Sequence, residues 1–199
     1  IRELKSMSRR LSALEKDFRR ENNRLEASET GCVSQRIIKS LGDVIAVLGA
    51  EIKSLKHDID HHINSNPTLK KNKELLKTIN GIGDVMAREL VYLFAAKDFS
   101  TAKQVAAYVG LIPKLNESGT FKGRTTLSKA GPSRIRAKLF LAAVTATKHN
   151  PDVRAQNDRL IRAGKTKIQA LGAAMRKLIQ ICFGVVKNLT EYRPQVIKI

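Results

Sequence analysis

Apolar residues recur every three or four positions along the first third of the chain, in two long stretches separated by a short break. Such steps place the apolar side chains on one stripe of a helix and are typical of helices that pair along a seam. In the first stretch the seam positions are Leu4, Met7, Leu11, Leu14, Phe18 and Leu25. In the second they are Ile37, Leu41, Val44, Leu48, Ile52, Leu55, Ile59 and Ile63. Residues 26–33 (EASETGCV) interrupt the pattern and residues 64–67 (NSNP) end it, so we predict a coiled-coil helical hairpin over residues 1–66.

A hairpin of this kind has one apolar stripe on each helix and little core of its own. The two stripes could pair with each other, with a second copy of the chain, or with both. We therefore predict that residues 1–66 are a dimerisation arm and that the protein is a homo-dimer or a higher oligomer.

The next pattern is two helical faces joined by a glycine turn, in the order helix, Asn80 to Gly83, helix. This order resembles a helix-hairpin-helix DNA-binding motif. In such a motif Gly81 and Gly83 would let the backbone approach a phosphate, which the N–H groups at the start of the second helix would bind. The alternative is an ordinary glycine turn in a helical bundle.

Four further helical patterns follow, at residues 101–109, 132–149, 152–162 and 166–189. The last has the longest apolar face, with Cys182 as a buried apolar residue, and we expect the tail from Arg193 to be frayed. Glycines and prolines cluster between residues 110 and 132, which predicts a long loop or a small hairpin between helices. The predicted fold is mainly α: a coiled-coil hairpin (1–66), a helical domain with a helix-hairpin-helix motif and a small irregular or β-hairpin insertion (67–192), and a tail (193–199).

Charge narrows the choice of partner. The chain has 199 residues, with 37 Lys and Arg against 18 Asp and Glu, and a formal net charge of +19. Such a balance indicates a polyanion, for which nucleic acid is favoured over a membrane surface. Aromatic residues make up only 5% and Trp is absent, which favours contact with the phosphate backbone over base stacking. In and beside the loop the predicted DNA-binding cations are Lys122, Arg124, Lys129, Arg134 and Arg136.

Metal and hydrolase chemistry find little support in the sequence. His57 and His61 are four residues apart and could share a metal, but they flank a buried seam and have no obvious third ligand, so we predict no metal site. No Ser-His-Asp arrangement is recognisable, and the acidic residues of the helical domain are too scattered for two-metal phosphoryl transfer. The chain therefore does not encode a complete metal nuclease, and we expect no cofactor in it.

Two serines of the basic loop could act as nucleophiles. An alcohol can attack a phosphodiester and conserve its energy in a phosphoserine ester, while neighbouring cations stabilise the developing charge. Ser118 precedes Gly119, which permits a tight turn that would expose the hydroxyl. Ser128 competes with it, although Ser128 also suits capping or phosphate binding just before a helix. From the residues alone, both could equally be turn serines without a catalytic role.

Several short motifs occur in a fixed order: residues 107–113 (AYVGLIP), 117–119 (ESG), 128–131 (SKAG) and 135–136 (IR), preceded by the glycine turn at 78–83 (TINGIG). This order resembles the C-terminal transposase domain of bacterial insertion-sequence recombinases that carry a RuvC-like N-terminal domain with a DEDD acidic tetrad, the bridge-RNA-guided recombinases. Residues 22–25 (NNRL) resemble the coiled-coil segment that follows their acidic domain. The resemblance covers nearly the whole chain. The chain departs from the family pattern at Ile135, where leucine is usual, and at Pro132.

The resemblance implies that Ser118 is the nucleophile of a DNA transposase or recombinase, with DNA and a guide RNA as partners in the bacterial cytoplasm, at the nucleoid. It also implies an acidic domain, absent from this chain, that supplies Mg²⁺-binding carboxylates. Because the chain starts without Met and within a helical pattern, we expect a fragment of a longer enzyme that is inactive alone. The alternative is a non-catalytic, architectural module that binds DNA or RNA and dimerises.

Overall fold

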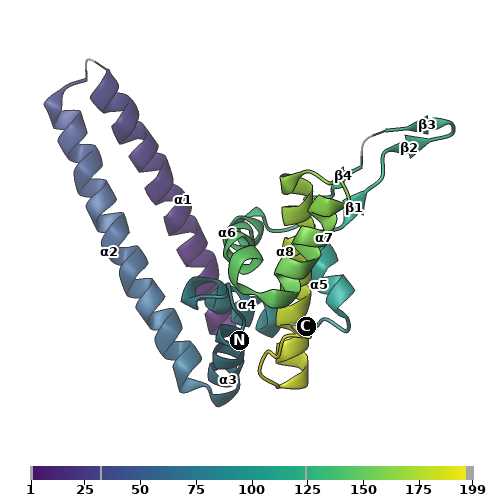
Figure 1. Cartoon of the computed structure of the whole chain (residues 1–199). Coiled ribbons are helices and arrows are strands. Elements are labelled where there is room, and N and C mark those ends of the chain that lie inside the picture. Colours follow the sequence, from purple (N-terminus) through teal and green to yellow (C-terminus); the bar gives the residue numbers. More distant parts are fainter. Residues whose placement is uncertain (1, 32, 124, 196–199) are drawn as a thin grey trace. The chain divides into compact units, whose positions relative to one another are not determined.

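The computed structural model describes residues 2–31, 33–123 and 125–195, and for Glu117, Phe121 and Lys122 it describes the backbone alone. Within these residues the chain forms helices α1 to α8 and four strands of two residues each (Figure 1). The predicted mainly α fold is confirmed. The chain divides into two compact units, residues 1–67 and 68–199.

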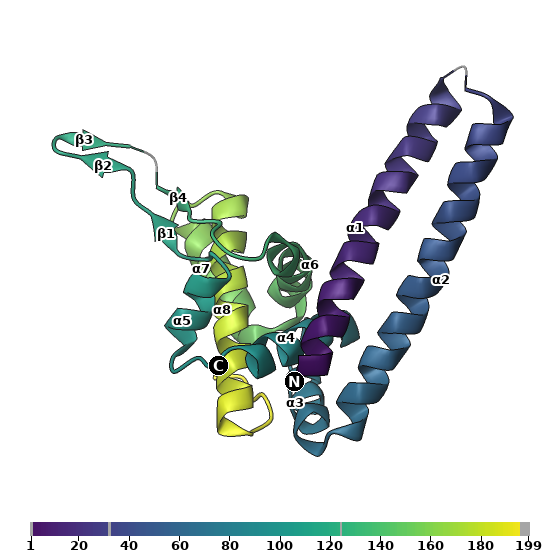
Figure 2. The same cartoon turned by 180° about the vertical axis from the view of Figure 1, so that it is seen from behind.

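Unit 1 is an antiparallel pair of long helices, α1 (Arg2–Thr30) and α2 (Gln35–Ser65), which run side by side in Figures 1 and 2. The Ser34 hydroxyl caps α2 by accepting the Arg36 N–H (3.3 Å), which satisfies one of the free donors at the start of the helix. The predicted helical hairpin is therefore confirmed as a pair of helices.

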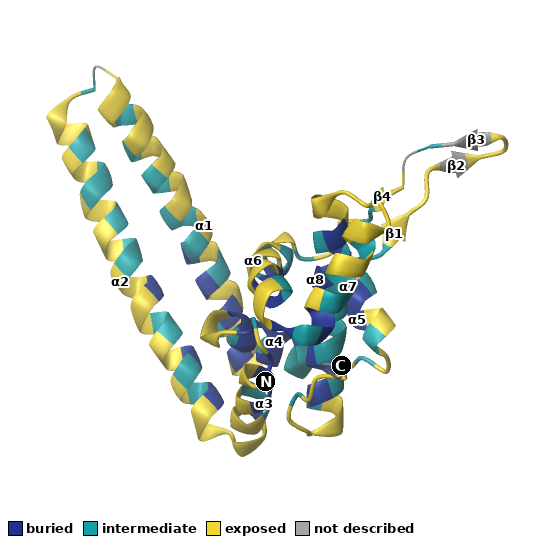
Figure 3. Ribbon diagram, viewed as in Figure 1, coloured by how far each residue is buried: buried dark blue, intermediate teal, exposed yellow. Residues whose placement is uncertain are grey.

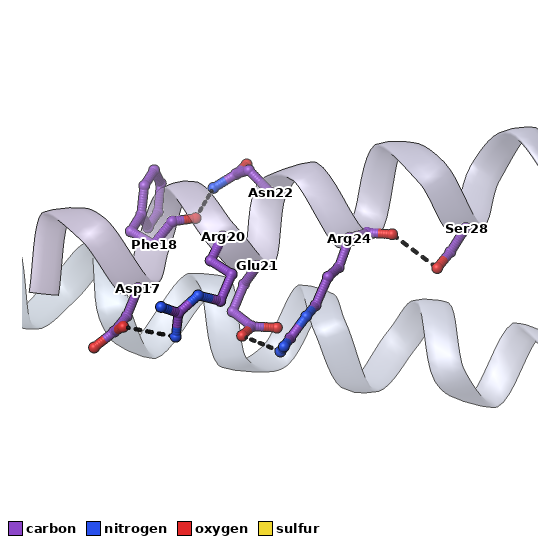
Figure 4. Close-up of polar contacts among 7 residues, drawn as sticks. All are labelled: Asp17, Phe18, Arg20, Glu21, Asn22, Arg24 and Ser28. Carbon is purple, nitrogen blue, oxygen red and sulfur yellow. Dashed lines mark hydrogen bonds and ion pairs between the residues drawn. The ribbon is translucent and has the colours of Figure 1, made fainter.

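Helix α1 continues beyond Leu25, where the sequence pattern predicted a break, and ends at Thr30. The Ser28 hydroxyl donates to the Arg24 carbonyl oxygen (2.8 Å), one turn back along the helix, and Asn22 makes a similar bond to Phe18 (2.7 Å) (Figure 4). A short polar side chain bonded in this way fits inside a helix, so Ser and Thr alone did not end it.

The apolar seam of α2 differs by one position from the prediction at two places. Ile37 and Val44 are 51% and 44% exposed, whereas their neighbours Ile38 and Ile45 are half-buried. Both residues of each pair are isoleucine or valine, so hydrophobicity could not show which of the two is the more buried. Ile37, Val44 and Val47 consequently form an apolar outer stripe on α2, since they are not buried against α1.

Unit 2 is a helical domain built around α8. Its helices are α3 (Pro67–Lys77), α4 (Asp84–Ala96), α5 (Ala102–Tyr108), α6 (Ser133–His149), α7 (Pro151–Arg162) and α8 (Lys167–Asn188). Helices α5, α6 and α7 pack against α8, and the buried residues gather where these helices meet (Figure 3). Cys182 is fully buried in α8, as predicted, and this burial raises the pKa of its thiol.

Among the described residues, α8 is the one helix that is long and apolar enough to cross a membrane by composition alone. Half of its most apolar window is buried within the protein. This burial is what a core helix requires, and the same residues account for its hydrophobicity.

The chain after α8 folds back onto unit 2 instead of fraying at Arg193. The Tyr192 hydroxyl donates to Asp152 Oδ2 (2.7 Å) and lies 2.8 Å from Asn150 Oδ1, while the Gln195 N–H donates to Asp152 Oδ1 (3.1 Å). The tail is anchored because Asn150 and Asp152 are buried polar groups that need partners. Residues 196–199 lie outside the described residues.

Candidate nucleic-acid interface and nucleophile

The insertion between α5 and α6 is a long β-hairpin. Strand β1 (Pro113–Lys114) pairs antiparallel with β4 (Thr126–Leu127), and β2 (Glu117–Ser118) pairs antiparallel with β3 (Phe121–Lys122). In Figures 1 and 2 the β2–β3 end projects away from the helices of unit 2. The predicted β-hairpin insertion is confirmed, and it is an arm that extends from the domain.

Ser118 lies at the tip of this arm. It pairs with Phe121, and the two residues between them, Gly119 and Thr120, form the turn. Gly119 has a φ of +54°, and hairpin loops of two residues need a positive φ at their first central position. Ser118 is exposed, and among the described residues beyond its two chain neighbours no atom lies within 4 Å of where a Gly119 Cβ would be. The expected tight turn with an accessible hydroxyl is therefore present.

Two glycines bring the ends of the arm together at its base. Gly110 (φ +76°) and Gly131 (φ +84°) both adopt the left-handed region. A Cβ on Gly110 would lie 2.1 Å from the Ala130 carbonyl oxygen, and one on Gly131 would lie 1.9 Å from that of Tyr108. Only glycine fits at these two places, because any side chain would overlap the facing backbone.

Arg136 fastens the same base. Its Nη1 lies within hydrogen-bond distance of the carbonyl oxygens of Val109 (3.1 Å), Ala130 (3.0 Å) and Gly131 (3.0 Å). These acceptors come from both ends of the arm, so Arg136 holds the two ends together. The sequence predicted that Arg136 binds DNA, whereas the geometry gives this nitrogen a structural role.

Ser128 and Lys129 lie at the base and not at the tip. The Ser128 hydroxyl accepts the Ala130 N–H (3.2 Å), while its own N–H donates to the Ile112 carbonyl oxygen (2.9 Å). Ser128 thus supports the turn before α6, as the sequence suggested. Lys129 is exposed and has a φ of +53°, and its N–H donates to the Gly110 carbonyl oxygen (3.1 Å).

Arg134 takes part in a buried ion cluster between α4 and α6. Glu89 is only 5% exposed, and its carboxylate accepts hydrogen bonds from Arg134 Nη2 (2.8 Å) and Lys138 Nζ (2.7 Å). A buried carboxylate requires such partners, so this donor of Arg134 serves the fold. Arg124 and the Lys122 side chain, also predicted to bind DNA, lie outside the described residues.

The glycine turn between α3 and α4 packs against α6. Gly81 has a φ of +102°, and a Cβ there would lie 2.7 Å from the Ala146 Cβ and 3.0 Å from the Ala142 carbonyl oxygen. Close packing therefore explains Gly81 without a phosphate, as in the bundle-turn alternative.

Gly83 differs from Gly81. It is exposed, it is the N-cap of α4, and no atom lies within 4 Å of a Cβ placed there. However, Asp84 occupies the first turn of α4 and accepts a 2.8 Å ion pair from Lys77, whose pKa is raised by this hydrogen bond and by the charge of Asp84. A carboxylate at the start of a helix competes with phosphate for the positive end of the dipole.

A polar network around Asn150 was not predicted from the sequence. The Asn150 side chain accepts the Val153 N–H (3.2 Å) and so caps α7, and its Nδ2 donates to the Asn80 carbonyl oxygen (3.4 Å). The network therefore ties the turn before α4, the start of α7 and the tail together. The Asn-Pro pair signalled the cap, but its distant partners have no sequence signal.

Metal ligands do not converge anywhere in the described ranges. No group of three or more His, Cys, Asp or Glu side chains there could hold a metal ion. His57 and Asp58 are both exposed, and His57 Nδ1 lies 3.8 Å from Asp58 Oδ1. The residues described here therefore do not fit a Mg²⁺ site.

The basic domain and its exposed serine arm suit a class of DNA-acting proteins, and comparison with known proteins supports that class. Residues 73–158 match the family model described as "Transposase IS116/IS110/IS902 family". The chain is 34% identical over 140 residues to the "Pilin gene-inverting protein" of Moraxella lacunata, an alignment that covers 69% of this chain and 44% of the relative.

Two more distant relatives agree with this match. The chain is 26% identical over 161 residues to the "Insertion element IS110 uncharacterized 43.6 kDa protein" of Streptomyces coelicolor, covering 80% of this chain and 39% of the relative. It is 25% identical over 163 residues to the "Probable family 20 transposase" of Pseudomonas aeruginosa, covering 79% and 47%. The chain thus spans less than half the length of these relatives.

These relatives are transposases, insertion-element proteins or gene-inverting proteins, which supports a DNA transposase or recombinase. The resemblance noted in the sequence is confirmed at this level. A serine nucleophile, an RNA guide and an additional acidic domain remain predictions.

Proposed function

We propose that this chain is part of a DNA recombinase in which Ser118 attacks a phosphodiester of the DNA backbone. The observation that carries the proposal is the position of the two competing serines: Ser118 is exposed at the tip of a projecting arm, whereas the Ser128 hydroxyl accepts the Ala130 N–H at its base. A nucleophile must be free to approach phosphorus, and a hairpin tip allows that approach.

In the proposed step, the Ser118 Oγ forms a bond to phosphorus and gives up its proton. The bond from phosphorus to one bridging oxygen breaks, and that oxygen leaves as a protonated hydroxyl. A hydroxyl from a second DNA strand later attacks the phosphoserine ester and releases the serine. No oxidant or external energy source is required, because each phosphoester bond that breaks is replaced by another.

The chain's own residues would hold the DNA in place. Lys114 and Lys129 are exposed at the base of the arm, and Lys122 and Arg124 lie along it in sequence. Cations in these places would neutralise phosphates on either side of the attacked bond. Because the described residues do not fit Mg²⁺, we expect any metal to be held by carboxylates outside this chain, in the acidic domain implied by the resemblance. A guide RNA and a place at the nucleoid of the bacterial cytoplasm are part of the same proposal.

The second candidate is a non-catalytic architectural module that binds nucleic acid and dimerises. The observation that favours it is the isolation of the Ser118 tip within unit 2, because no described helix of that unit lies beside the tip in Figures 1 and 2 to supply a general base. Covalent chemistry at Ser118 separates the two candidates, since both predict DNA binding.

The test uses the full-length protein that contains this chain and a nicked, suicide DNA substrate. Recombination should be lost in Ser118→Ala, DNA binding should persist, and stability should change by less than about 0.5 kcal/mol because the site is exposed. Mass spectrometry of the trapped complex should locate a phosphoester at Ser118.

Ser128→Ala is the matched control, since it removes a hydroxyl from the base of the same arm. It should lose about 0.5–1.5 kcal/mol of stability with its hydrogen bond and should still form the covalent complex. A phosphoester at Ser128, or full recombination by Ser118→Ala, would remove Ser118 from the mechanism. DNA binding without any covalent complex would favour the architectural module.

A further inference from the structure

Several cations of unit 2 are already occupied by contacts within the fold. Arg134 and Lys138 bind the buried Glu89, and Arg136 binds backbone carbonyl oxygens at the base of the arm. Lys187 donates to the Ser100 carbonyl oxygen (2.8 Å). Fewer cations near the arm therefore remain available for an outside partner than the sequence suggests.

One group of available cations lies in and on either side of the turn between α7 and α8, outside the segment predicted from the sequence to bind DNA. We call this group the turn cations: Arg159, Arg162, Lys165 and Lys167. The sequence from 159 to 167 contains no Asp or Glu, and residues 161–169 are all exposed. Within the described part of the chain none of the four is ion-paired, and the nearest acid in sequence, Asp158, already pairs with Arg154 (3.8 Å).

A capping box and a glycine fix the conformation of this turn. The Thr166 hydroxyl accepts the Gln169 N–H (3.4 Å) and the Gln169 side chain accepts the Thr166 N–H (3.0 Å), a capping box that fixes the first turn of α8. Gly164, with a φ of +79°, ends α7 and reverses the chain. The four cations are thus carried by the ends of two packed helices.

The base of the arm lies at the same end of α8. The Leu127 side chain of β4 packs against Gly172, with its Cδ1 3.3 Å from where a Cβ of that glycine would be. Gly172 follows Lys167 by five residues, which is a rise of about 7.5 Å along a helix. Figures 1 and 2 both show the α7–α8 turn beside β1 and β4.

We propose that the turn cations and the arm-base lysines, Lys114 and Lys129, form one continuous contact surface for the phosphate backbone of duplex DNA. This inference rests on the proposed function, because it assigns the surface that holds the duplex while the arm presents Ser118. A duplex is the fitting partner because residues 159–167 contain no aromatic side chain on which an unpaired base could stack. Lysine and arginine there can neutralise phosphates without reading sequence.

The test measures how the affinity of the 199-residue chain for duplex DNA of about 30 base pairs depends on salt, by fluorescence anisotropy. The quadruple variant Arg159→Ala, Arg162→Ala, Lys165→Ala and Lys167→Ala should flatten the slope of log affinity against log salt by up to about 3.6, since each phosphate contact contributes about 0.9. The single variants Arg162→Ala and Lys165→Ala should each flatten it by up to about 0.9. These exposed single changes keep the test valid if the quadruple variant unfolds.

The charge-matched control is Lys5→Ala, Arg10→Ala, Lys39→Ala and Lys53→Ala, which removes four exposed cations from unit 1. It should change the slope by less than about 1, because it leaves the proposed surface intact. Equal effects of the two quadruple variants would overturn the inference in favour of general attraction by net charge. So would an unchanged slope in the turn variants, or a wild-type chain that does not bind duplex DNA.

A duplex RNA competitor of the same length provides the remaining comparison. If the turn variants keep their affinity for duplex DNA and lose affinity only for the duplex RNA competitor, the surface is an RNA contact and the inference is wrong. Ser118→Ala should leave the salt slope unchanged, so the failure of the nucleophile would be seen only in the covalent trap. The failure of the turn surface would be seen only in the slope.

Discussion

At the scale of single residues, polar groups with distant partners hold unit 2 together. Asp152 is only 7% exposed, and its carboxylate is satisfied by the Tyr192 hydroxyl and the Gln195 N–H of the tail. The Tyr192 N–H also donates to the Thr78 hydroxyl (2.9 Å), beside the glycine turn. One tyrosine in the tail therefore stabilises contacts with segments that are far away in sequence.

Tyr192→Phe should lower the free energy of unfolding by about 1–2 kcal/mol, because the buried Asp152 loses a donor. Tyr108→Phe is the control, since no described protein group accepts a hydrogen bond from its hydroxyl, and it should change stability by less than about 0.5 kcal/mol. Urea unfolding followed by far-UV circular dichroism measures both. Equal stability of the two variants would show that the Tyr192 hydroxyl does not contribute to the stability of the fold.

The same tyrosine gives a pH dependence with a definite sign. Burial, together with the hydrogen bond and charge of Asp152, raises the pKa of Tyr192 above its ordinary value. A group whose pKa is raised on folding contributes fully below its unfolded pKa and less as pH rises past it. The stability difference between the wild type and Tyr192→Phe should therefore be constant near neutrality and shrink above about pH 10.

At the scale of elements, the position of the β-hairpin depends on the backbone contacts at its base. Gly110 and Gly131 let residues 108–111 and 128–131 approach closely, and Arg136 joins the two segments. At the tip, by contrast, no described residue beyond the chain neighbours of Gly119 lies within 4 Å of a Cβ placed there. The arm is therefore fixed at its base, while its tip has few neighbours that restrict substitution.

Gly110→Ala tests this difference, with Gly164→Ala as its control. Gly164 has the same left-handed backbone (φ +79°), but no described residue beyond its chain neighbours lies within 4 Å of a Cβ placed there. Gly164→Ala should lose about 1–2 kcal/mol, the cost of placing a side chain in that conformation. Gly110→Ala should lose about 1–3 kcal/mol more, because its Cβ overlaps the Ala130 carbonyl oxygen. Urea unfolding of the two variants measures the difference, and similar losses would mean that the base is loosely packed.

The elements also show what the sequence could and could not predict. Helix starts follow from local chemistry, so the caps Ser34, Thr101 and Thr166 were accessible from sequence, and the helix limits in unit 2 agree within about one or two residues. The partners of Arg134, Arg136 and Gly81 were not accessible. Each contact joins segments distant in sequence, and a basic residue in a loop looks the same whether it binds DNA or a carbonyl oxygen.

In the candidate site, too, local features could be predicted from the sequence, whereas contacts between distant segments could not. The exposure of Ser118 followed from the Ser-Gly pair and the turn that it favours, both of which are local. The turn cations were visible in the sequence as a basic stretch, but their position beside the arm depends on Leu127 packing against Gly172. That packing brings together residues 45 positions apart, which no periodicity in the sequence indicates.

At the scale of the whole molecule, unit 1 has more apolar surface than one helical pair can cover. Leu4, Leu11 and Leu14 of α1 are buried, while Val47 in the outer stripe of α2 is 64% exposed. An exposed apolar stripe along a long helix favours packing against another helix. The outer stripe therefore offers a specific surface for the predicted dimerisation, whereas the sequence pattern left open whether the stripes pair with each other, with a second copy, or with both.

We predict that the chain is a dimer at tens of micromolar and that the outer stripe is its contact. The triple variant Ile37→Glu, Val44→Glu and Val47→Glu should be a monomer, because burying three carboxylates in an apolar interface is unfavourable. It should keep its helix content, since none of the three positions is buried in unit 1. Analytical ultracentrifugation measures the mass, and circular dichroism the helix content.

The control places three carboxylates elsewhere on the exposed surface of α2, as Gln35→Glu, Ala46→Glu and Ala50→Glu, so that each variant gains three negative charges. This variant should remain a dimer, because its new carboxylates stay in water. Deleting residues 1–66 should also give a monomer if unit 1 carries the contact. A monomeric wild type at tens of micromolar would contradict the prediction. A triple stripe variant that stays dimeric, beside a monomeric deletion, would instead place the contact on the inner seam through an exchange of helices between two chains.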